Sequence, residues 1–420
     1  MRLLVIGASA AGLSAATHAR RLDPRLDVTV LEKSNVVSLG LCGLPYFVEG
    51  RVPDWAWLLA RPPEYFSRMQ IDVRTGKEAV AIRHAARRVR LAGGEELAYD
   101  KLVIACGARA EPGPEGSFSM STLAGAIHLR EHLETTKPGE ARVAGGGYIG
   151  LEAVEALRAR GRRVALSHAG PDLLDRADPW LTGRIVRHLE RCRVEVRLNE
   201  RIRAAAAGEC LVWAAGLRPN VGLAAEAGVE TGRSGAIRVT DRMETNLGSV
   251  YAAGDCIEVT HRVTGRPVWM PLGTTANKTG RVAGAAAAGR LERFPGIAGT
   301  SIVRVCGLGI GLTGLSEGQA RQEGFQPVTA IIDARDRAAY FCGRPASVQL
   351  VADRISGRLL GGAVIGEYGV EGRVNTIATA LGAGMDAEGF AGLDLAYAPP
   401  YSPPWDPLLL AGRQLLKLLN

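Results

Sequence analysis

The chain opens on an apolar run at residues 2–6, which a glycine-containing turn at 7–12 joins to a longer mixed segment at 13–21. A short apolar run is typical of a buried parallel strand, and the longer segment predicts a helix. A second apolar run, at 141–144, leads into the glycine-rich residues 145–150 in the same way. Two strand-turn-helix units predict an α/β fold with two Rossmann-like dinucleotide-binding domains.

The C-terminal part of the chain has a different pattern. From about residue 299, Val, Ile, Leu and Gly occur in short alternating runs, such as 347–351 and 359–364. These runs predict strands, and a helix is expected over about 372–381. We therefore expect an α+β domain in this region.

The closing segment is rich in proline and aromatic residues. Five prolines occur between residues 399 and 407, beside Tyr397, Tyr401 and Trp405. Proline favours extended backbone, so we expect a rigid segment that packs against another surface, such as that of a partner subunit.

The first glycine turn carries the features of a dinucleotide site. It reads G-x-S-x-x-G, in which Gly7 permits the turn, small Ser9 lets the backbone approach a pyrophosphate, and Gly12 lets helix pack on strand. The motif alone is weak. It gains weight because a second strand, at 28–31, ends in Glu32, the expected position for an acid that binds a ribose hydroxyl. The phosphates are then expected at the helix N-terminus.

The second turn, from Gly145 to Gly150, is a full G-x-G-x-x-G motif. Two such motifs imply two dinucleotides, and a flavin with a nicotinamide is the combination that uses both. A third signal is the strand that ends in Gly254 and Asp255, where a carboxylate can contact the ribityl hydroxyls of a flavin. A strand-end aspartate is more commonly a turn residue, but after two nucleotide-binding units we prefer the flavin interpretation.

Cys42 is the candidate redox residue. It lies shortly after the first glycine turn, and Gly43, Pro45 and the apolar residues beyond them predict a helix that starts just past the sulfur. A helix N-terminus stabilises a thiolate, and the thiolate is the nucleophile. For the other six of the seven cysteines, a structural role is the default interpretation.

Composition narrows the class of protein. With 420 residues, 47% of them hydrophobic, the chain is long enough for two to four domains. The seven cysteines show no CxxC or CxxxxC spacing, so we expect neither a zinc site nor a disulfide framework. No leader and no membrane-spanning run is recognised, which predicts a cytoplasmic protein. The net charge of +8 comes from scattered arginines, and it favours a polyanionic small substrate over nucleic acid.

Together these motifs resemble the flavin-dependent pyridine nucleotide-disulfide oxidoreductases, in particular the single-cysteine branch of coenzyme A-disulfide reductases, persulfide reductases and NADH oxidases or peroxidases. The resemblance covers nearly the whole chain and is most specific at residues 42–46, 271–281 and 395–401. The fold that it implies is glutathione-reductase-like, with an FAD-binding domain at 1–108 and 233–296, a shortened NAD(P)H-binding domain at 109–232, and a C-terminal α+β dimerisation domain at 297–420. In the implied homodimer, the last domain completes the active site of the partner.

The resemblance also assigns cofactor contacts. The FAD contacts that it implies are Gly7, Ser9, Ala10, Ala11, Gly12, Glu32, Lys33, Ser38, Cys106, Gly107, Gly254, Asp255, Pro271, Leu272, Gly273, Thr274 and Ala276. The NAD(P)H contacts that it implies are Gly145, Gly147, Tyr148, Ile149, Gly150, Glu152 and His168. Cys106 replaces a threonine of relatives, and we interpret it as a packed small residue without a chemical role.

Position 10 distinguishes the chemistries within the branch. Oxidase and peroxidase members have a histidine there that serves the sulfenic-acid chemistry of the cysteine. This chain has Ala10, and it thereby resembles the disulfide reductases, which have a small residue at that position. In those reductases two tyrosines of the partner subunit assist at the thiol, and Tyr340 and Tyr397 match them. A half-buried packing aromatic is the alternative for each.

The reaction that the resemblance implies uses one protein cysteine. NAD(P)H passes a hydride to FAD, which reduces a mixed disulfide between Cys42 and coenzyme A and releases one thiol. The Cys42 thiolate then attacks the next coenzyme A disulfide, or a coenzyme A persulfide, and restores the mixed disulfide. One alternative is an NADH oxidase. The other is a flavoprotein that senses thiol redox state without turning over a nicotinamide.

Three departures from the family bear on the nicotinamide and substrate sites. Between residues 200 and 211 the chain lacks the strand meander of relatives, so the domain is shortened by a hairpin or more. His168 stands where NADH-using relatives have an acid, and with Arg162 and Arg163 nearby this favours NADPH. Leu41 replaces the asparagine before the thiol. The trimmed domain and His168 support the sensor alternative, whereas the intact glycines oppose it.

Overall fold

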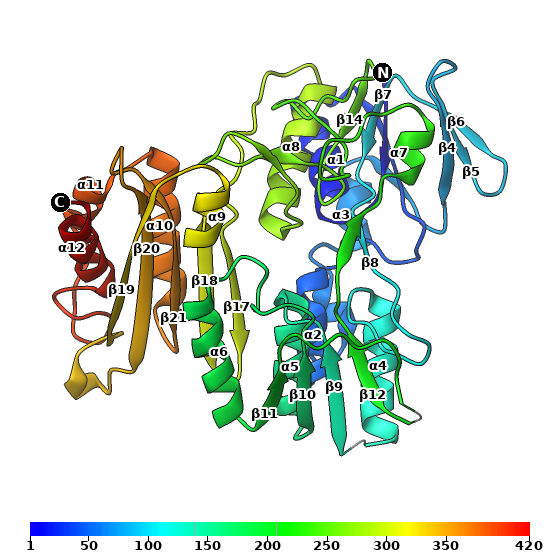
Figure 1. The fold of residues 1–420 in the computed structure, drawn as a ribbon. Helices are drawn as coiled ribbons and strands as arrows, with labels where there is room; N and C mark the ends of the chain where they lie inside the picture. Colours follow the sequence, from blue (N-terminus) through cyan, green and yellow to red (C-terminus); the bar gives the residue numbers. More distant parts are fainter. Residues whose placement is uncertain (138, 207) are drawn as a thin grey trace.

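Three layered units make up the chain, and we call them the first, second and third lobes. The computed structural model describes residues 1–137, 139–206 and 208–420. Figure 1 shows the first lobe, which holds the N-terminus, at the upper right, the second lobe below it, and the third lobe, which holds the C-terminus, at the left.

A parallel five-stranded sheet is the centre of the first lobe. In the order in which they pair, its strands are β14 (Val250–Ala252), β7 (Lys101–Ile104), β1 (Arg2–Ile6), β2 (Asp27–Leu31) and β3 (Ile71–Arg74). All neighbouring pairs are parallel. The helices α1 (Ala10–Leu22) and α8 (Gly273–Ala287) pack against each other beside it. This arrangement confirms the first predicted strand-turn-helix unit.

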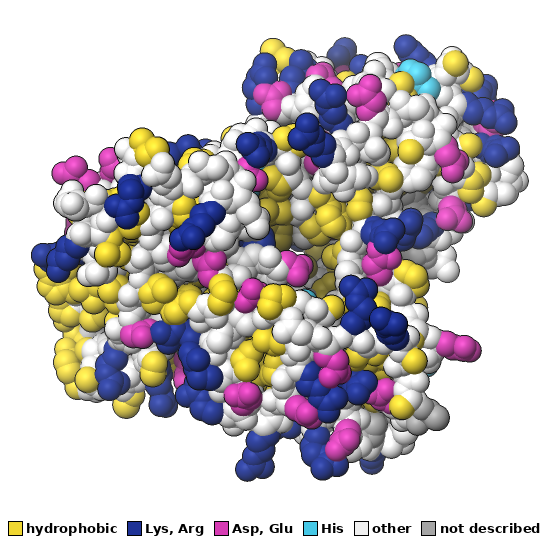
Figure 2. Space-filling model, viewed as in Figure 1, with side chains coloured by type: hydrophobic (Ala, Val, Ile, Leu, Met, Phe, Trp, Pro, Cys, Tyr) yellow, Lys and Arg dark blue, Asp and Glu magenta, His cyan; other side chains and the backbone are white. Residues whose placement is uncertain are grey.

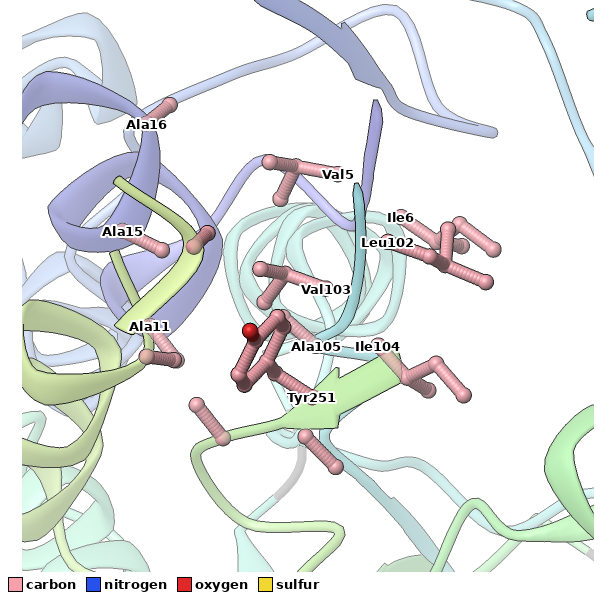
Figure 3. Close-up of a cluster of buried hydrophobic side chains, with 14 of the residues drawn as sticks. Val5, Ile6, Ala11, Ala15, Ala16, Leu102, Val103, Ile104, Ala105 and Tyr251 are labelled. Carbon is pink, nitrogen blue, oxygen red and sulfur yellow. The ribbon is translucent and has the colours of Figure 1, made fainter. Parts of the chain in front are cut away.

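Apolar side chains fill both faces of this sheet. Figure 3 shows Val5 and Val103 directed toward the side of α1 that carries Ala11, whereas Leu102 and Ile104 lie on the opposite face. All five residues are buried. Side chains alternate between the two faces of a strand, so a strand that is covered on both faces is apolar throughout. This explains the unbroken apolar runs in the sequence.

Smaller elements complete the first lobe and its border with the second. They are a three-stranded antiparallel sheet of β4 (Ala79–Arg83), β5 (Arg88–Leu91) and β6 (Glu96–Ala98), the strands β15 (Val259–Thr260) and β16 (Pro267–Val268), the 3-10 turns Leu41–Gly43 and Trp55–Leu58, and the helices α2 (Leu44–Glu49), α3 (Pro63–Arg68) and α7 (Gly222–Glu226). Leu44, Phe47 and Val48 of α2 belong to the apolar core of the second lobe. The segment that follows Cys42 therefore joins the first lobe to the second.

The second lobe repeats the parallel plan. Its sheet pairs β11 (Val194–Arg197), β10 (Arg163–Ser167), β9 (Glu140–Ala144) and β12 (Cys210–Trp213) in that order, and its helices are α4 (Leu123–Thr135), α5 (Tyr148–Ala159) and α6 (Pro179–Arg191). The antiparallel pair β8 (Ala108–Ala110) and β13 (Leu217–Pro219) lies where the chain enters and leaves this lobe. The described residues between β11 and β12 form no strand, in agreement with the shortened sequence.

The third lobe is an antiparallel sheet with helices against it. The sheet pairs β17 (Ser301–Val305), β18 (Leu308–Gly314), β21 (Leu359–Gly366), β20 (Pro345–Asp353) and β19 (Pro327–Arg335), and the helices are α9 (Glu317–Gln322), α10 (Val370–Ala383), α11 (Ala387–Ala391) and α12 (Pro407–Leu419). A 3-10 turn at Ala339–Phe341 lies between β19 and β20. The predicted strands, the predicted helix and the α+β class are all confirmed.

The last helix, α12, was absent from the sequence prediction. The proline-rich segment does not continue as an extended arm, because Pro407 occupies the first turn of this helix, where its missing N–H is harmless. Asp406 caps the helix by accepting from the Leu408 N–H at 2.9 Å, and it also pairs with buried Arg373 at 2.8 Å. Within the described residues, we find no helix with the length and apolar character needed to cross a bilayer.

Candidate active site

Cys42 lies in the 3-10 turn Leu41–Gly43, just before α2. The predicted helix beyond the sulfur is confirmed. A second helix also approaches the sulfur, since a Cβ placed on Gly273, at the start of α8, would lie 4.0 Å from Cys42 Sγ. Cys42 is an exposed thiol, and Figure 2 shows a recess where the three lobes meet.

The surroundings of Cys42 do not make it a thiolate by themselves. Partial burial raises the pKa of the Cys42 thiol, and the nearby carboxyl groups of Glu152 and Asp255 raise it further. The stabilisation of a thiolate that we expected from the helix N-terminus is therefore outweighed in the single chain. Burial is the largest cause of the raised pKa, and the helix that follows has only six residues to oppose it.

Glu152 is the titratable group that distinguishes this site. It lies on α5 of the second lobe, and burial raises the pKa of its carboxyl group to about 7. Its charge also raises the pKa of Tyr46, after burial as the main cause. The sequence identified Glu152 as a nicotinamide contact, and its near-neutral titration beside a thiol was missed. The sequence feature that could have indicated it is an acidic residue on the apolar face of a predicted helix.

The first glycine turn has the geometry of a dinucleotide cradle. Gly7 has φ of +107°, and a Cβ there would lie 2.3 Å from the Ala105 carbonyl oxygen. A Cβ on Gly12 would lie 1.9 Å from the Gly7 carbonyl oxygen, so the helix touches the turn directly. Ser9 precedes α1 without capping it by its side chain, which leaves the N-terminal N–H groups of α1 for an anion. The turn therefore fits a pyrophosphate.

Glu32 and Ser38 lie beside this turn. The Glu32 carboxylate accepts hydrogen bonds from the Ala8 N–H at 3.0 Å and the Ser34 N–H at 2.9 Å. The Ser38 N–H donates to the Ala8 carbonyl oxygen at 3.0 Å, and its hydroxyl oxygen accepts from the Arg61 N–H. The structure thus places the predicted ribose-binding acid at the edge of the glycine turn.

Cys106 and Gly107, which follow β7, lie in the first lobe among the predicted FAD contacts. Cys106 packs against the core of this lobe, and burial raises the pKa of its thiol to about 11, whereas neighbouring Lys33 lowers it. This agrees with a packed residue without a chemical role. A Cβ on Gly107 would have no heavy atom within 4 Å, so open space adjoins the strand end.

The segment around Gly254 and Asp255 also reaches the cradle. A Cβ on Gly254 would lie 2.7 Å from the Ala11 side chain, and its N–H donates to the Thr279 hydroxyl on α8 at 3.1 Å. Burial raises the pKa of the Asp255 carboxyl group. The predicted contacts at the start of α8 lie close by in sequence and structure, namely Pro271, Leu272, Gly273, Thr274 and Ala276, while Ala10 begins α1. Most of the predicted FAD contacts therefore lie just beyond the carboxyl ends of β1, β2, β7 and β14 or at the start of α8.

The second glycine turn is equally tight. Gly145 has φ of +110°, and a Cβ on Gly150 would lie 1.8 Å from the Gly145 carbonyl oxygen. A Cβ on Gly147 would meet nothing within 4 Å, so the middle of the turn faces open space. Tyr148 hydrogen-bonds to Ser301 of β17, and Ile149 packs against the core of the second lobe. The turn is therefore open to a nucleotide and fixed on its other side.

His168 is half-buried and contacts the turn. Its Nδ1 accepts a hydrogen bond from the Gly146 N–H at 3.1 Å. A carboxylate also lies near this strand end, because the Ser167 hydroxyl donates to Glu200 at 2.9 Å. Sequence reasoning found no acid there, since Glu200 follows the neighbouring strand β11. The site thus combines a histidine with an acid from another strand.

Tyr340 and Tyr397 lie together in the third lobe. Partial burial and the neighbouring Tyr340 hydroxyl raise the pKa of Tyr397. Tyr340 is 73% exposed and Tyr397 49% exposed, so Tyr340 in particular is not a packed residue within this chain. Figure 1 shows their lobe on the far side of the molecule from most of the first lobe. The structure therefore brings the tyrosines together and leaves their faces uncovered.

Known proteins resemble the whole chain. Residues 1–289 match the family pyridine nucleotide-disulphide oxidoreductase, and residues 300–407 match the dimerisation domain of that family. The NAD(P)H coenzyme A polysulfide/persulfide reductase of Pyrococcus horikoshii is 37% identical over 439 residues, which cover 99% of this chain and 98% of the relative.

Two solved structures show the same fold. The NAD-dependent persulfide reductase from A. fulgidus has a TM-score of 0.95 at 35% identity, covering 99% of this chain and 83% of the other. The reduced CoADR-RHD of Bacillus anthracis has a TM-score of 0.96 at 28% identity, covering 100% of this chain and 80% of the other. These findings confirm the predicted family and fold class. The chain therefore belongs to the pyridine nucleotide-disulphide oxidoreductase family and is an oxidoreductase with that family's dimerisation domain.

Proposed function

We propose that this oxidoreductase reduces a disulfide or persulfide of coenzyme A, with Cys42 as its only redox cysteine at the active site. The observation that carries the proposal is the position of the Cys42 sulfur, which lies next to the start of α8 and near enough to Glu152 of the second lobe for that carboxyl group to raise its pKa. A thiol held between two nucleotide cradles is suited to exchange with a sulfur substrate.

FAD and NAD(P)H fit the two cradles. FAD would be held by the Gly7 turn, Glu32, Asp255 and the start of α8, and NAD(P)H by the turn from Gly145 to Gly150. When bound, the pair supplies two electrons to the sulfur centre. The tight glycines would let the phosphates approach the N-termini of α1 and α5, where free N–H groups favour negative charge.

Cys42 acts as the nucleophile in this proposal. Its sulfur attacks the substrate disulfide, a new bond forms between Cys42 and one sulfur, and the other sulfur leaves as a thiolate. The start of α8 contributes free N–H groups beside the sulfur, which favour its charged form. This contribution opposes the effects of burial and of the two carboxylates on the Cys42 pKa.

Glu152 is suited to hold the proton that the leaving thiolate needs. Its pKa of about 7 keeps part of the population protonated at neutral pH. It lies close enough to Cys42 to raise the pKa of that thiol. We therefore assign Glu152 the role of proton donor to the departing sulfur, in addition to its place beside the nicotinamide turn.

Coenzyme A is proposed as the carrier of the substrate sulfur because relatives carry that name and because the surface is basic. The relative from Pyrococcus horikoshii is named for coenzyme A polysulfide and persulfide. A net charge of +8 favours a polyanion. Ala10, in place of a histidine, supports a reductase over an oxidase.

Two finer features belong to the same proposal. We expect a homodimer in which Tyr340 and Tyr397 approach Cys42 of the partner, because both are exposed in the single chain and lie beside each other.

NADPH is expected to be preferred through His168, although Glu200 at the same strand end would repel a 2'-phosphate. Comparing kcat/KM for NADPH and NADH in Glu200→Gln tests that balance.

The experiment that tests the proposal compares two cysteine variants. Cys42→Ser is expected to lower the rate of coenzyme A disulfide reduction by orders of magnitude, because it removes the nucleophile. Cys192→Ser, at the residue that follows α6 in the second lobe, is the control and is expected to keep the rate. A Cys42→Ser protein with normal disulfide reduction would contradict the proposal. Rapid oxygen consumption without added disulfide would favour the NADH oxidase instead.

A further inference from the structure

Apart from Cys42, a pair of thiols lies where the second lobe contacts the third. Cys192 follows the last residue of α6, and Cys306 lies at the tip of the hairpin formed by β17 and β18. Both are free and partly exposed. They are far apart in sequence and belong to different lobes, so only the fold brings them together.

One histidine nitrogen contacts both cysteine residues. His188 Nε2 is 3.0 Å from the Cys306 carbonyl oxygen and 3.6 Å from Cys192 Sγ. An N–H at this nitrogen donates to the carbonyl oxygen and faces the sulfur of Cys192. These two contacts place the Cys192 sulfur beside the backbone of Cys306, and the Cys192 side chain lies near enough to raise the pKa of the Cys306 thiol.

The turn that holds Cys306 is unusual for its sequence. Val305 pairs with Leu308, so the hairpin loop has two residues, and both have positive φ, 49° for Cys306 and 83° for Gly307. Asn, Asp or Gly is the usual first residue of such a turn, because other side chains are strained in the left-handed region. The Cys306 N–H also hydrogen-bonds to Glu155 of α5, which fixes the tip against the second lobe.

The two thiols differ in their surroundings. Burial raises the pKa of Cys306 to about 12, and neighbouring Cys192 and Glu155 raise it further. Cys306 is therefore protonated at neutral pH and reacts slowly with an external disulfide. Cys192 has the donor at His188 Nε2 beside its sulfur. An external oxidant should therefore react first at Cys192.

We propose that Cys192 and Cys306 form a reversible disulfide, which makes them a second redox site that joins the second lobe to the third. The oxidant is a small-molecule disulfide. The Cys192 thiolate attacks it, forms a mixed disulfide and expels one thiolate. Cys306 then attacks Cys192 of that mixed disulfide, loses its proton and releases the second thiol. Two protein thiols are oxidised, and one external disulfide is reduced to two thiols.

The link has a mechanical consequence. It attaches the end of α6 to the β17–β18 hairpin, which already contributes Val303, Val305 and Ile310 to the core of the second lobe. A covalent bond at this border restricts separation of the two lobes during unfolding. The oxidised protein should therefore melt at a higher temperature than the reduced protein, and a thiol reductant should reverse the shift.

Peptide mapping of the full-length protein loaded with FAD tests the proposal. The protein carries Cys42→Ser, so that the disulfide reductase reaction does not consume the oxidant. It is reduced, freed of reductant and treated with oxidised glutathione until exposed Cys342 is fully modified. After acid quenching and alkylation, pepsin digestion at low pH preserves disulfides, because protonated thiols do not exchange. The expected product is a linked pair of peptides that contain Cys192 and Cys306.

Three results would overturn the proposal. The first is full alkylation of both cysteines, the second is a separate glutathione adduct on each without a link, and the third is a link of either one to Cys342. The variant Cys306→Ser is expected to leave a glutathione adduct at Cys192, and Cys342→Ser should keep the link. The intact mass of the protein that carries only Cys42→Ser also distinguishes the linked form from a form with a glutathione adduct on each cysteine. Because Cys42 is absent throughout, failure of the reductase proposal does not affect this result.

Discussion

At the scale of single residues, Glu152 shows how burial produces chemistry. Its carboxyl group lies on an apolar helix of the second lobe, and burial raises its pKa to about 7. The unfolded chain ionises this group near pH 4.5, so the folded protein carries an unfavourable charge at higher pH. The same shift suits the group to the proton-donor role that we propose for it near Cys42.

Stability should report this shift. Because the folded pKa lies above the unfolded value, the stabilising effect is complete below about pH 4.5 and is lost as pH rises through about 7. We expect Glu152→Gln to be more stable than the parent protein by about 3 kcal/mol at pH 8 and to differ little at pH 4.5. Urea unfolding of the cofactor-free protein across this range measures it. Glu115→Gln, an exposed carboxyl group, is the control, and an equal gain there would contradict the account.

His261 should act in the opposite direction. Burial lowers the pKa of this 1% exposed histidine to about 4, and nearby Arg176 lowers it further. Because the folded pKa lies below the unfolded value, stability is complete above about pH 6.5 and is lost as pH falls through about 4. We expect a loss of about 3 kcal/mol over this range that His261→Phe reduces. Urea unfolding between pH 7 and 4 measures the slope, and an unchanged slope in the variant would contradict the assignment.

At the scale of elements, the close packing of α1 against α8 fixes the position of the start of α8 beside the first glycine turn. Gly280 and Gly284 of α8 face α1, and a Cβ on either would lie 2.2 Å from the carbonyl oxygen of Ala11 or Ala15. The obstacle is backbone, so the helices would have to separate. The start of α8 lies beside Cys42, so such a separation would also shift the groups around the thiol.

The variant Gly284→Ala tests this contact. We expect it to destabilise the protein by about 1–3 kcal/mol, because overpacking against backbone outweighs the better helix propensity of alanine. Gly372→Ala on α10 is the matched control, since its Cβ would meet nothing within 4 Å. That change should stabilise by about 0.5–1 kcal/mol. Thermal unfolding of both variants measures the difference, and a stabilising Gly284→Ala would show that the helices do not touch as described.

Elements differed in how well the sequence predicted them. The two glycine motifs predicted β1 with α1 and β9 with α5 correctly, because tight strand-to-helix turns need glycine at fixed spacing. Helix α12 was missed because a proline-rich segment favours extended backbone, although Asp406 followed by Pro407 is typical of a helix N-terminus. Glu200 and the thiol pair of Cys192 and Cys306 were missed for another reason. Their neighbours come from distant parts of the chain, which no local pattern reveals.

At the scale of the whole molecule, the lobes share cores across their borders. The helix α2 follows Cys42 and packs into the second lobe, and the hairpin of β17 and β18 from the third lobe does the same. Cys42, the proposed redox thiol, therefore lies at a border that both glycine turns adjoin. The third lobe also carries uncovered aromatic residues, and Figure 2 shows hydrophobic side chains gathered on the left edge, where Figure 1 places α12. A second copy of the chain is the proposed cover.

The most direct measurement mixes the FAD-loaded protein with NADPH, and separately with NADH, in the absence of oxygen. After treatment with coenzyme A disulfide, the account predicts that at least one nucleotide bleaches the visible flavin band and releases coenzyme A from Cys42. Cys42→Ser should still bleach but release no coenzyme A. A flavin that stays oxidised with both nucleotides would contradict the reductase account and favour a protein that senses thiol redox state.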